Sequence, residues 1–394
     1  MVAKRKVPRK IESHKGKKKR GWLQRVEESR FSKFLPSCLF LLLTVLLFRT
    51  FIFGEGFLFG TDTLEAGIMF RGFYADFVRS HQTLPLWNPY LFGGLPFIDA
   101  MHGDTFYPLA SLQFLLPLEK ALGYKLVITV FLAGLFAYLF LRQLGLSRWV
   151  ATFGGCVYQL SSVLVSAVYG GHDGRMYVTS LLPLLLFTLD RALRRKRIID
   201  HLYFALVFAL LIYANHPQFA YFAMWLTGAY FVFALVLDFL QNRKWLPILR
   251  QTLLFVIALA IGLSASLVQI LPEYVYLRDH SPRSEEGRGY EFASSWSLHP
   301  EEVVDQVVPG FSGYNVRTER TYWGRNPFNL NSEYGGLVPL VLALIALYLI
   351  KDPRQYLFLG DTLVALFYAL GDNTPFFTIF YHLEIGRASC RERV

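Results

Sequence analysis

The sequence has few charged residues for its length. Only 18% of its 394 residues are Asp, Glu, Lys or Arg, whereas 54% are hydrophobic and the mean hydropathy is +0.35. A soluble chain of this length needs polar faces on most of its helices, and a disordered chain needs low hydrophobicity. The composition excludes both classes and favours a protein that lies in a lipid bilayer.

Cysteine and the common catalytic motifs are also scarce. Three cysteines cannot form a disulfide framework, and Cys38 and Cys156 fall within apolar runs, where we expect them to pack as small core residues. Zinc-ligand spacings, a P-loop and a nucleophile elbow are absent from the sequence. Function must therefore be sought in residues that these motifs do not cover.

Positive charge is concentrated at the amino terminus. Residues 1–33 hold 13 Lys and Arg against three Glu, which accounts for +10 of the formal net charge of +11. A basic run can bind nucleic acid, but nothing downstream resembles a nucleic-acid-binding fold, so we expect no nucleic-acid partner. We interpret residues 1–34 as a cytoplasmic tail that contacts anionic membrane lipids.

Long apolar runs follow the basic tail. The runs are long enough to cross the hydrocarbon core as helices, so the sequence predicts an all-α, polytopic transmembrane bundle over residues 35–383. We expect about nine spans: Leu35–Phe53, Tyr124–Leu141, Trp149–Val168, Met176–Leu193, Leu202–Ala214, Phe219–Leu240, Ile248–Leu271, Tyr334–Ile350 and Gln355–Leu370.

The Lys and Arg clusters between these runs alternate in position. With the amino terminus in the cytoplasm, every later cluster also falls on the cytoplasmic side, which satisfies the positive-inside rule. Large extracytoplasmic loops are then expected at residues 54–123, 170–175, 215–218 and 273–333. Unusual polar residues gather in these loops, so we look for function there.

The first predicted outer loop places Asp62 shortly after the first span. Asp62 and Glu65 have the spacing of a capping box, which would start an amphipathic helix that runs through Val78 along the membrane surface. A carboxylate at this depth can also act as a general base on an acceptor hydroxyl. Spacing alone favours the cap, and one carboxylate can do both.

The same loop continues with prolines, paired glycines and aromatic residues over 84–97. Such a segment is typical of an aromatic belt at the headgroups, and it also suits a wall for a sugar or a lipid headgroup. His102 and Asp104 follow it as secondary candidates for substrate binding.

The second predicted outer loop contains His172, Asp173 and Arg175 between glycines. Ionisable groups at the end of two apolar spans are costly unless they pair or face a watery cavity. A simple turn contact between Asp173 and Arg175 and a ligand site explain the cluster about equally well.

Several short motifs together resemble the bacterial YfhO-type membrane protein family, which is placed with the GT-C superfamily of glycosyltransferases. The motifs lie between Gly60 and Leu383, and the Leu-Pro-Leu-Trp-Asn-Pro run is the most specific. They are Gly60-Thr61-Asp62, Leu84–Pro89 with Phe92–Pro96, His172–Arg175, Trp296-Ser297, Tyr322–Gly324, Glu333–Gly336 and Leu370–Pro375.

The resemblance implies a GT-C-like enzyme of the bacterial plasma membrane. Its donor would be a polyprenyl-phosphate-linked sugar, and its acceptor a cell-envelope glycan, teichoic acid or lipid. Asp62 matches the position of the family's base, although the tandem acidic pair usual after the first span is absent because Thr63 follows. Transfer with inversion is expected.

The leaving phosphate gains negative charge, so fixed cations should stabilise the transition state, and Arg175 and Arg71 are the candidates. His172 and Asp173 are candidates for binding acceptor, phosphate or a divalent ion. Superfamily members differ in their use of metal, so a divalent cofactor remains open.

Two further regions carry expectations. The loop at 273–333 has six arginines and several acidic residues, and we interpret it either as a lid or acceptor-binding element or as a solvated connection. The final residues 384–394 resemble the translation of a sequencing adapter, so the natural protein is expected to continue past Leu383.

Two other functions fit a polytopic chain. A transporter or flippase of lipid-linked sugars would place charges and broken helices near the bilayer midplane, often in repeated halves, and no internal repeat is apparent. A non-catalytic membrane scaffold would leave the acidic residues of the outer loops dispensable.

Overall fold

The computed structural model describes residues 33–58, 60–101, 103–280, 289–316, 319–330 and 332–382. Nearly all of the predicted basic tail and the adapter-like residues 384–394 lie outside these ranges, and so does His102. The described chain is predominantly helical, as the all-α prediction requires. It adds only two pairs of two-residue strands: β1 (Trp87–Asn88) with β2 (Leu95–Pro96), and β3 (Asn315–Val316) with β4 (Glu319–Arg320).

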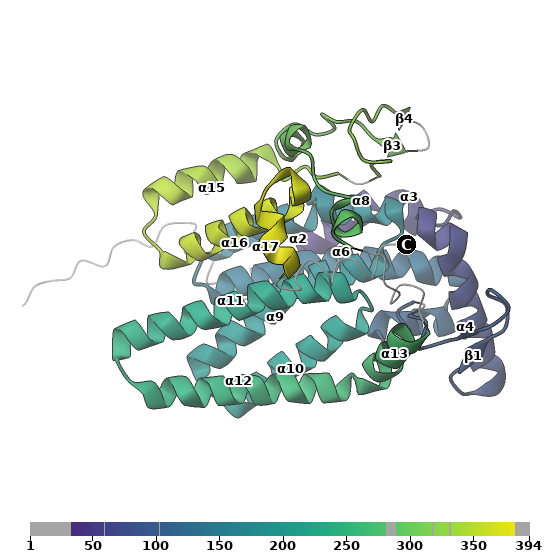
Figure 1. Cartoon of the computed structure of the whole chain (residues 1–394), viewed down its shortest axis with the longest axis horizontal. Coiled ribbons are helices and arrows are strands. Elements are labelled where there is room, and N and C mark those ends of the chain that lie inside the picture. The colour runs from purple at the N-terminus through teal and green to yellow at the C-terminus, as the bar shows by residue number, and fades with distance from the viewer. Residues whose placement is uncertain are drawn as a thin grey trace, which may run out of the picture.

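The long helices lie roughly side by side and form an elongated bundle (Figure 1). Their residues are mainly Leu, Phe, Val, Ile and Ala, so apolar side chains cover all sides of each helix. The helical conformation pairs the backbone N–H and C=O groups within the segment, as the hydrocarbon core requires. They are α2 (Leu35–Leu47), α6 (Leu118–Gln143), α7 (Arg148–Gln159), α8 (Ser162–Gly170), α9 (Asp173–Arg195), α10 (Ile198–Tyr213), α11 (Pro217–Asn242), α12 (Trp245–Ala265), α15 (Leu337–Leu349) and α16 (Pro353–Ala369).

Shorter elements connect them, mostly where the sequence predicted outer loops. They are α3 (Arg49–Ile52), the π-helical turn η2 (Thr63–Gly67), α4 (Ile68–His81), η3 (Pro108–Ser111), α5 (Leu112–Leu115), α13 (Leu267–Asp279), α14 (Tyr290–Ser294), η5 (Pro300–Gln306), η6 (Gly371–Asn373) and α17 (Phe376–His382).

Five helical segments in the described ranges are long and apolar enough to cross a membrane. They are Leu118–Gln143, Arg148–Gly170, Asp173–Arg195, Pro217–Asn242 and Trp245–Ala265. Three shorter apolar helices, Leu35–Leu47, Ile198–Tyr213 and Leu337–Leu349, fall at other expected spans. The chain is therefore a multi-helix membrane protein, and the total of about nine spans stays a prediction.

Three expected spans are not continuous helices, and the first of them, Leu35–Phe53, is divided at Phe48 between α2 and α3. The run Trp149–Val168 is divided between α7 and α8, with the break at Leu160 and Ser161, and Ile248–Leu271 is divided at Ser266 between α12 and α13. Hydropathy reports only whether a stretch prefers lipid, so it does not detect a change of helix direction inside that stretch.

Helix α9 is the centre of the bundle. It packs against α6, α10 and α11. In the apolar window of α9, 67% of residues are buried inside the protein, against 22% in α11 and α12. Tyr177, Leu185 and Leu189 of α9 are almost completely inaccessible. Residues near the start of α9 are therefore held in fixed positions by the surrounding helices.

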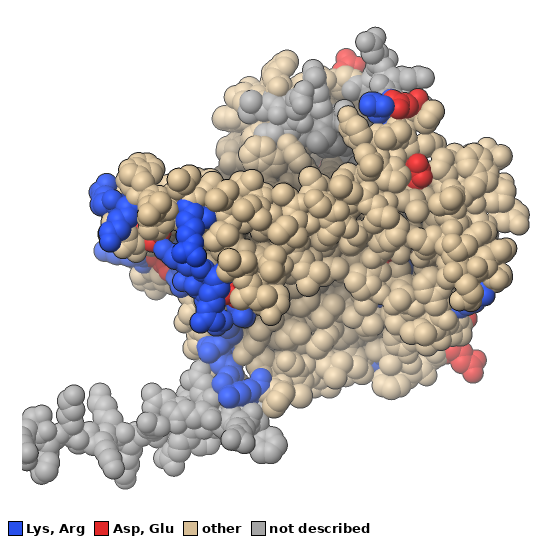
Figure 2. Space-filling view, turned by 90° about the horizontal axis from the view of Figure 1, so that it is seen from below, with Lys and Arg blue, Asp and Glu red and all other residues tan. Residues whose placement is uncertain are grey.

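Basic side chains gather at one end of the bundle (Figure 2). Interactions between helix ends hold this end together: Lys196 Nζ lies 3.1 Å from Asp238, and Arg354 Nη1 donates to Leu144 O at 3.1 Å. We call it the basic end; the helix termini there carry Arg142, Arg148, Arg194, Arg195, Lys196, Arg197, Arg243, Lys244 and Arg354.

The predicted outer loops meet at the opposite end, where Figure 1 shows α4, α13 and β1. Asn215 Nδ2 donates to Met101 O at 3.2 Å, and Ser332 N donates to Ser166 Oγ at 3.0 Å. Parts of three predicted loops are thus brought against one another or against a helix at this end, which we call the loop end.

Candidate functional site

Two glycines bring the segment after the first apolar helix against the start of α9. A Cβ on Gly60 would collide with the backbone of Gly171, and Gly171 has a φ of +75°, which favours glycine. Thr61 Oγ1 donates to Gly170 O at 3.3 Å across the same contact. The close approach sets the next residue, Asp62, beside His172.

Asp62 and His172 form a pair in which the carboxylate is exposed and the imidazole is half-buried. His172 Nε2 lies 3.2 Å from Asp62 Oδ2, and 61% of the Asp62 side chain is exposed. The hydrogen bond from His172 lowers the pKa of Asp62 below its ordinary value of 3.8. The carboxylate is therefore ionised at neutral pH and open to a ligand.

The capping-box interpretation of Asp62 is wrong. Asp62 precedes η2 but its side chain forms no capping hydrogen bond, and its own backbone is already helical. The carboxylate contacts His172 instead, because the Gly60–Gly171 contact brings the second loop within reach. The predicted amphipathic helix does form, as η2 and α4, and it extends to His81.

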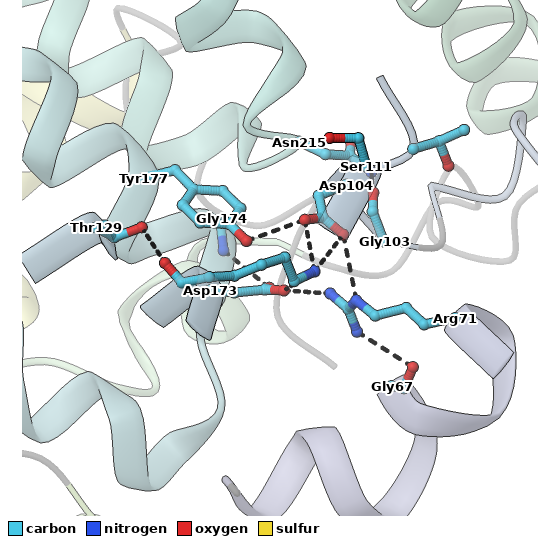
Figure 3. A network of polar contacts seen from close by, with 12 residues as sticks. Gly67, Arg71, Gly103, Asp104, Ser111, Thr129, Asp173, Gly174, Tyr177 and Asn215 are labelled. Carbon is cyan, nitrogen blue, oxygen red and sulfur yellow. Dashed lines mark hydrogen bonds and ion pairs between the residues drawn. The ribbon is translucent and has the colours of Figure 1, made fainter. Parts of the chain in front are cut away.

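A second group of polar side chains is buried next to this pair (Figure 3). Asp104 is at its centre, in the loop before η3, and it is only 3% exposed. Its carboxylate accepts from Lys125 Nζ at 2.7 and 3.0 Å, from Arg71 Nε at 3.2 Å and from Tyr177 Oη at 3.0 Å. Each oxygen of Asp104 therefore accepts from two donors.

Asp173, the first residue of α9, completes the group. It accepts from Arg71 Nη2 and from Gly174 N, and Lys125 Nζ lies 3.7 Å away. Arg71 also donates to Gly67 O at 3.2 Å. We call Arg71, Asp104, Lys125, Asp173 and Tyr177 the closed network, because two cations face two carboxylates and their charges are mutually compensated.

The charges of the closed network stabilise one another. Burial alone would raise the pKa of Asp104, but Lys125 and Arg71 lower it well below the usual carboxylate range. Burial alone would lower the pKa of Arg71, but Asp173 and Asp104 raise it further above its usual value. A buried pair of this kind is costly to break, because removing one member leaves a charge without compensation.

Arg175 differs from Arg71 in forming no ion pair with a carboxylate among the described residues, although the charge of Glu333 acts on it. In the described parts of the chain its guanidinium forms no ion pair and donates no hydrogen bond; it lies over the Phe219 ring, 5.1 Å from the centroid. Of the two interpretations of this cluster, the turn contact between Asp173 and Arg175 is wrong, because Asp173 pairs with Arg71 and Lys125.

The charge of Arg175 acts on two neighbouring groups, Glu333 and His216. Burial raises the pKa of the Glu333 carboxyl, and the positive charge of Arg175 opposes this shift. Burial lowers the pKa of His216 to about 4, helped by the nearby His172 and Arg175, so His216 is neutral at physiological pH. We call Asp62, His172 and Arg175 the open group.

The structure thus divides the sequence-predicted candidates between two neighbouring sets. Asp62, His172 and Arg175 form the open group, whereas Arg71, Asp104 and Asp173 belong to the closed network. Sequence reasoning missed Lys125 and Tyr177. The sequence did contain a signal for Lys125: it directly follows Tyr124, the predicted start of an apolar span, and a lysine at such a position needs a buried anionic partner.

The described ranges contain no cluster of side chains suited to bind a metal ion. Groups of three or more His, Cys, Asp or Glu side chains arranged to hold an ion do not occur among those residues.

Fold and site together define a polytopic helical membrane protein with a polar site at one end of its bundle. Comparison with known families agrees: residues 105–308 match the model of the 6-pyruvoyl-tetrahydropterin synthase related domain, described as a membrane protein. The match spans more than half of the chain, so the protein belongs to this family.

The matched region contains Lys125, His172, Asp173 and Arg175, while Asp62 and Arg71 precede it. Neither a curated protein nor a solved structure matches the chain.

Proposed function

We propose that the protein is a membrane glycosyltransferase that transfers a sugar from a polyprenyl-phosphate donor to a cell-envelope acceptor. We place the reaction at the loop end and the loop end outside the cytoplasm, since the basic end fits the cytoplasmic side under the positive-inside rule. The resemblance to the YfhO-type family and the GT-C superfamily supports this assignment, because the motifs that carry it include the open group.

The observations that carry the proposal are an Arg175 that forms no ion pair among the described residues and an ionised Asp62 that contacts His172, three positions before Arg175 in sequence. A guanidinium with free donors can bind two phosphate oxygens at once. Arg71 is less suited to this role because Asp104 and Asp173 already occupy its donors. Phe219 lies against the Arg175 guanidinium, with its ring centroid 5.1 Å from Arg175 Cζ.

In the proposed reaction Asp62 accepts the proton of an acceptor hydroxyl. The acceptor oxygen forms a bond to the anomeric carbon as the bond from that carbon to the phosphate oxygen breaks. The polyprenyl phosphate leaves with the bonding electron pair, and configuration at the anomeric carbon is inverted. Arg175 stabilises the charge that develops on the phosphate, and His172 holds the Asp62 carboxylate in position.

A direct test measures sugar release from polyprenyl-phosphate-sugar in membranes that contain the protein. Asp62→Asn should reduce the rate about 10² to 10⁴-fold, the usual contribution of a general base. Asp76→Asn is the matched control, because Asp76 is an exposed carboxylate of α4 whose ion pair in the described chain is with Arg79, at 3.4 Å. Normal turnover in Asp62→Asn would rule out this mechanism.

A transporter of lipid-linked sugars is the second candidate. The break between α7 and α8 inside a membrane-spanning segment and the buried Lys125 are features that such proteins use. The same membranes distinguish the two: movement of intact donor across the bilayer without bond cleavage favours transport, and cleavage favours transfer. A scaffold would do neither.

A further inference from the structure

Two further carboxylates lie near Glu333, the acidic residue whose charge acts on Arg175. They are Glu302 and Asp305 of η5. Burial raises the pKa of Glu333, Arg175 opposes this shift, and the negative charges of Asp305 and Glu302 add to it. Each of these charged groups is therefore close enough to Glu333 to act on it. We call Glu302, Asp305 and Glu333 the acidic wall.

Backbone contacts on both sides hold Glu333 in this position. Ser332 N donates to Ser166 Oγ of α8 at 3.0 Å. Gly335 N donates to Gln306 O, at the end of η5, also at 3.0 Å. The chain at Glu333 is thus fixed between α8, which leads into α9, and η5, which carries the other two carboxylates.

Neutral donors, rather than cations, stabilise the other two members of the acidic wall. Glu302 is only 5% exposed and accepts from Tyr322 Oη at 2.5 Å. Asp305 is 4% exposed and accepts from Ser312 N at 3.0 Å. A neutral donor stabilises a carboxylate without cancelling its charge. In the described parts of η5 and its surroundings the ion pair is formed by a different acid, Glu301, with Arg325.

This arrangement limits the charge that Arg175 can bind. An anion at its guanidinium is attracted by one positive charge and repelled by the carboxylate of Glu333, with Glu302 and Asp305 behind it. A phosphodiester carries one negative charge. A phosphomonoester carries up to two at neutral pH, because its second pKa is about 6. Arg175 can balance the first charge, and the second is opposed by the acidic wall.

We propose that Glu333 makes the phosphate site at Arg175 select a singly charged phosphodiester over a doubly charged phosphomonoester. This inference rests on the proposed function and adds the charge selectivity of the same site. In the proposed reaction the donor is a phosphodiester, whereas the polyprenyl phosphate that leaves is a phosphomonoester. The repulsion from Glu333 therefore favours release of the product over release of the donor.

Two probes with the same apolar chain test this selectivity. Farnesyl phosphate is a phosphomonoester, and its methyl ester is a phosphodiester, so contributions from the chain cancel in the ratio of their dissociation constants. Isothermal titration calorimetry on the full chain in detergent measures both constants. At about pH 8 the wild type should bind the methyl ester about tenfold more tightly, the effect of one like-charge repulsion in a partly solvated site. In Glu333→Gln the ratio should fall to about twofold or less, because farnesyl phosphate binds more tightly.

The ratio should also depend on pH. Below a second pKa of about 6 farnesyl phosphate carries one charge, so the wild-type ratio should approach one. Protonation of Glu333, whose pKa is raised, acts in the same direction because a neutral carboxyl does not repel the phosphate. A wild-type ratio that stays the same as pH falls would overturn the proposal.

Two control variants keep the result interpretable if Glu333→Gln folds poorly. Glu333→Asp retains the charge and should retain most of the wild-type ratio. Glu301→Gln removes an acid of the same outer segment that pairs with Arg325 at 2.7 Å and is not among the groups that act on Glu333. Its ratio should equal that of the wild type.

The outcomes separate this inference from the proposed function. Equal ratios in the wild type and Glu333→Gln, with binding that Arg175→Gln abolishes, overturn the selectivity and leave the phosphate site intact. Failure of both probes to bind, or binding that Arg175→Gln does not weaken, would overturn the phosphate site and the selectivity with it. A ratio that depends on Glu333, in a protein that releases no sugar, supports this inference and removes the enzyme.

Discussion

The closed network and the open group are neighbours, but they differ in how far their charges are compensated by ion pairs within the protein. Both use arginine and aspartate from the same loops. In the closed network Arg71 and Asp104 are buried and each contacts several partners, whereas in the open group Arg175 forms no ion pair among the described residues and Asp62 is exposed. The contrast teaches that compensation, rather than residue type, separates groups that hold the fold from groups available to a ligand.

The two sets are also mechanically connected. Asp173 of the closed network lies between His172 and Arg175 of the open group in sequence, and its bonds to Arg71 and Lys125 fix the first turn of α9. The closed network therefore positions the open group, and changes in the former should affect folding before they affect chemistry.

The largest expected effect is the loss of Lys125. In Lys125→Met the Asp104 carboxylate keeps its burial but loses its closest cation, so we expect a loss of about 3 to 5 kcal/mol in unfolding free energy. Chemical denaturation in detergent measures it. Lys120→Met on the same helix is the control, since Lys120 is half-buried, donates to the carbonyls of Gly54 and Gly56 and lies over the Phe51 ring without facing a carboxylate in the described chain, and it should lose about 1 kcal/mol.

A double variant sharpens this result. Adding Asp104→Asn to Lys125→Met removes the uncompensated carboxylate, so the pair should be more stable than Lys125→Met alone. Equal unfolding free energies for Lys125→Met and Lys120→Met would contradict the closed network.

The next prediction compares the same substitution, Arg to Gln, at Arg71 and at Arg175. Arg71→Gln should reduce unfolding free energy by about 3 kcal/mol because it leaves two carboxylates short of a cation. Arg175→Gln should change stability by less than about 1 kcal/mol but reduce the sugar-release rate about 10² to 10³-fold. Paired denaturation and turnover measurements test both, and a reversed pattern would overturn the comparison.

A smaller effect is expected at Gly67, whose carbonyl accepts from Arg71. A Cβ there would lie 2.6 Å from Arg71 Nη1, and the bonds of Arg71 to Asp104 and Asp173 limit its retreat. Gly67→Ala should cost about 1 to 2 kcal/mol of unfolding free energy. Gly228→Ala on α11 meets nothing within 4 Å and should be neutral or slightly stabilising, so similar losses in both would refute the close contact.

The smallest effect concerns the pH dependence of the open group. The hydrogen bond from His172 lowers the pKa of Asp62 below its ordinary value of 3.8. In the folded protein the Asp62 carboxylate therefore stays ionised as pH falls through 3.8, and it is protonated only when pH falls through the lower folded pKa. In His172→Ala the acid limb of the sugar-release rate should move upward, towards pH 4. His172→Gln can still donate a hydrogen bond and should restore part of the shift; an unchanged acid limb in both would remove His172 from this role.

Much of the architecture followed from the sequence. Apolar length placed helices at the expected runs, and the positions of Lys and Arg anticipated the basic end. The amphipathic pattern after Asp62 correctly predicted η2 and α4. These features depend on residues near each other in the chain, where spacing is informative.

Pairing over long distances could not be predicted in the same way. The sequence marks Arg71, Asp104 and Asp173 as candidates for substrate binding, but it does not indicate that they contact one another. Arg71 and Asp173 are separated by 102 positions in sequence. Lys125 was overlooked because the predicted span began at Tyr124, whereas α6 begins at Leu118 and carries the lysine inside it.

By itself, the sequence determined that the chain is helical, lies in a membrane and collects its polar candidates at the end opposite its basic residues, because hydrophobicity and charge act on each segment separately. Tertiary structure alone decided which of those candidates neutralise each other and which stay available. That choice depends on the contact of Gly60 with Gly171 and on the packing of α6, α9 and α4, since electrostatic compensation requires atoms within a few ångströms and chain spacing does not supply that information.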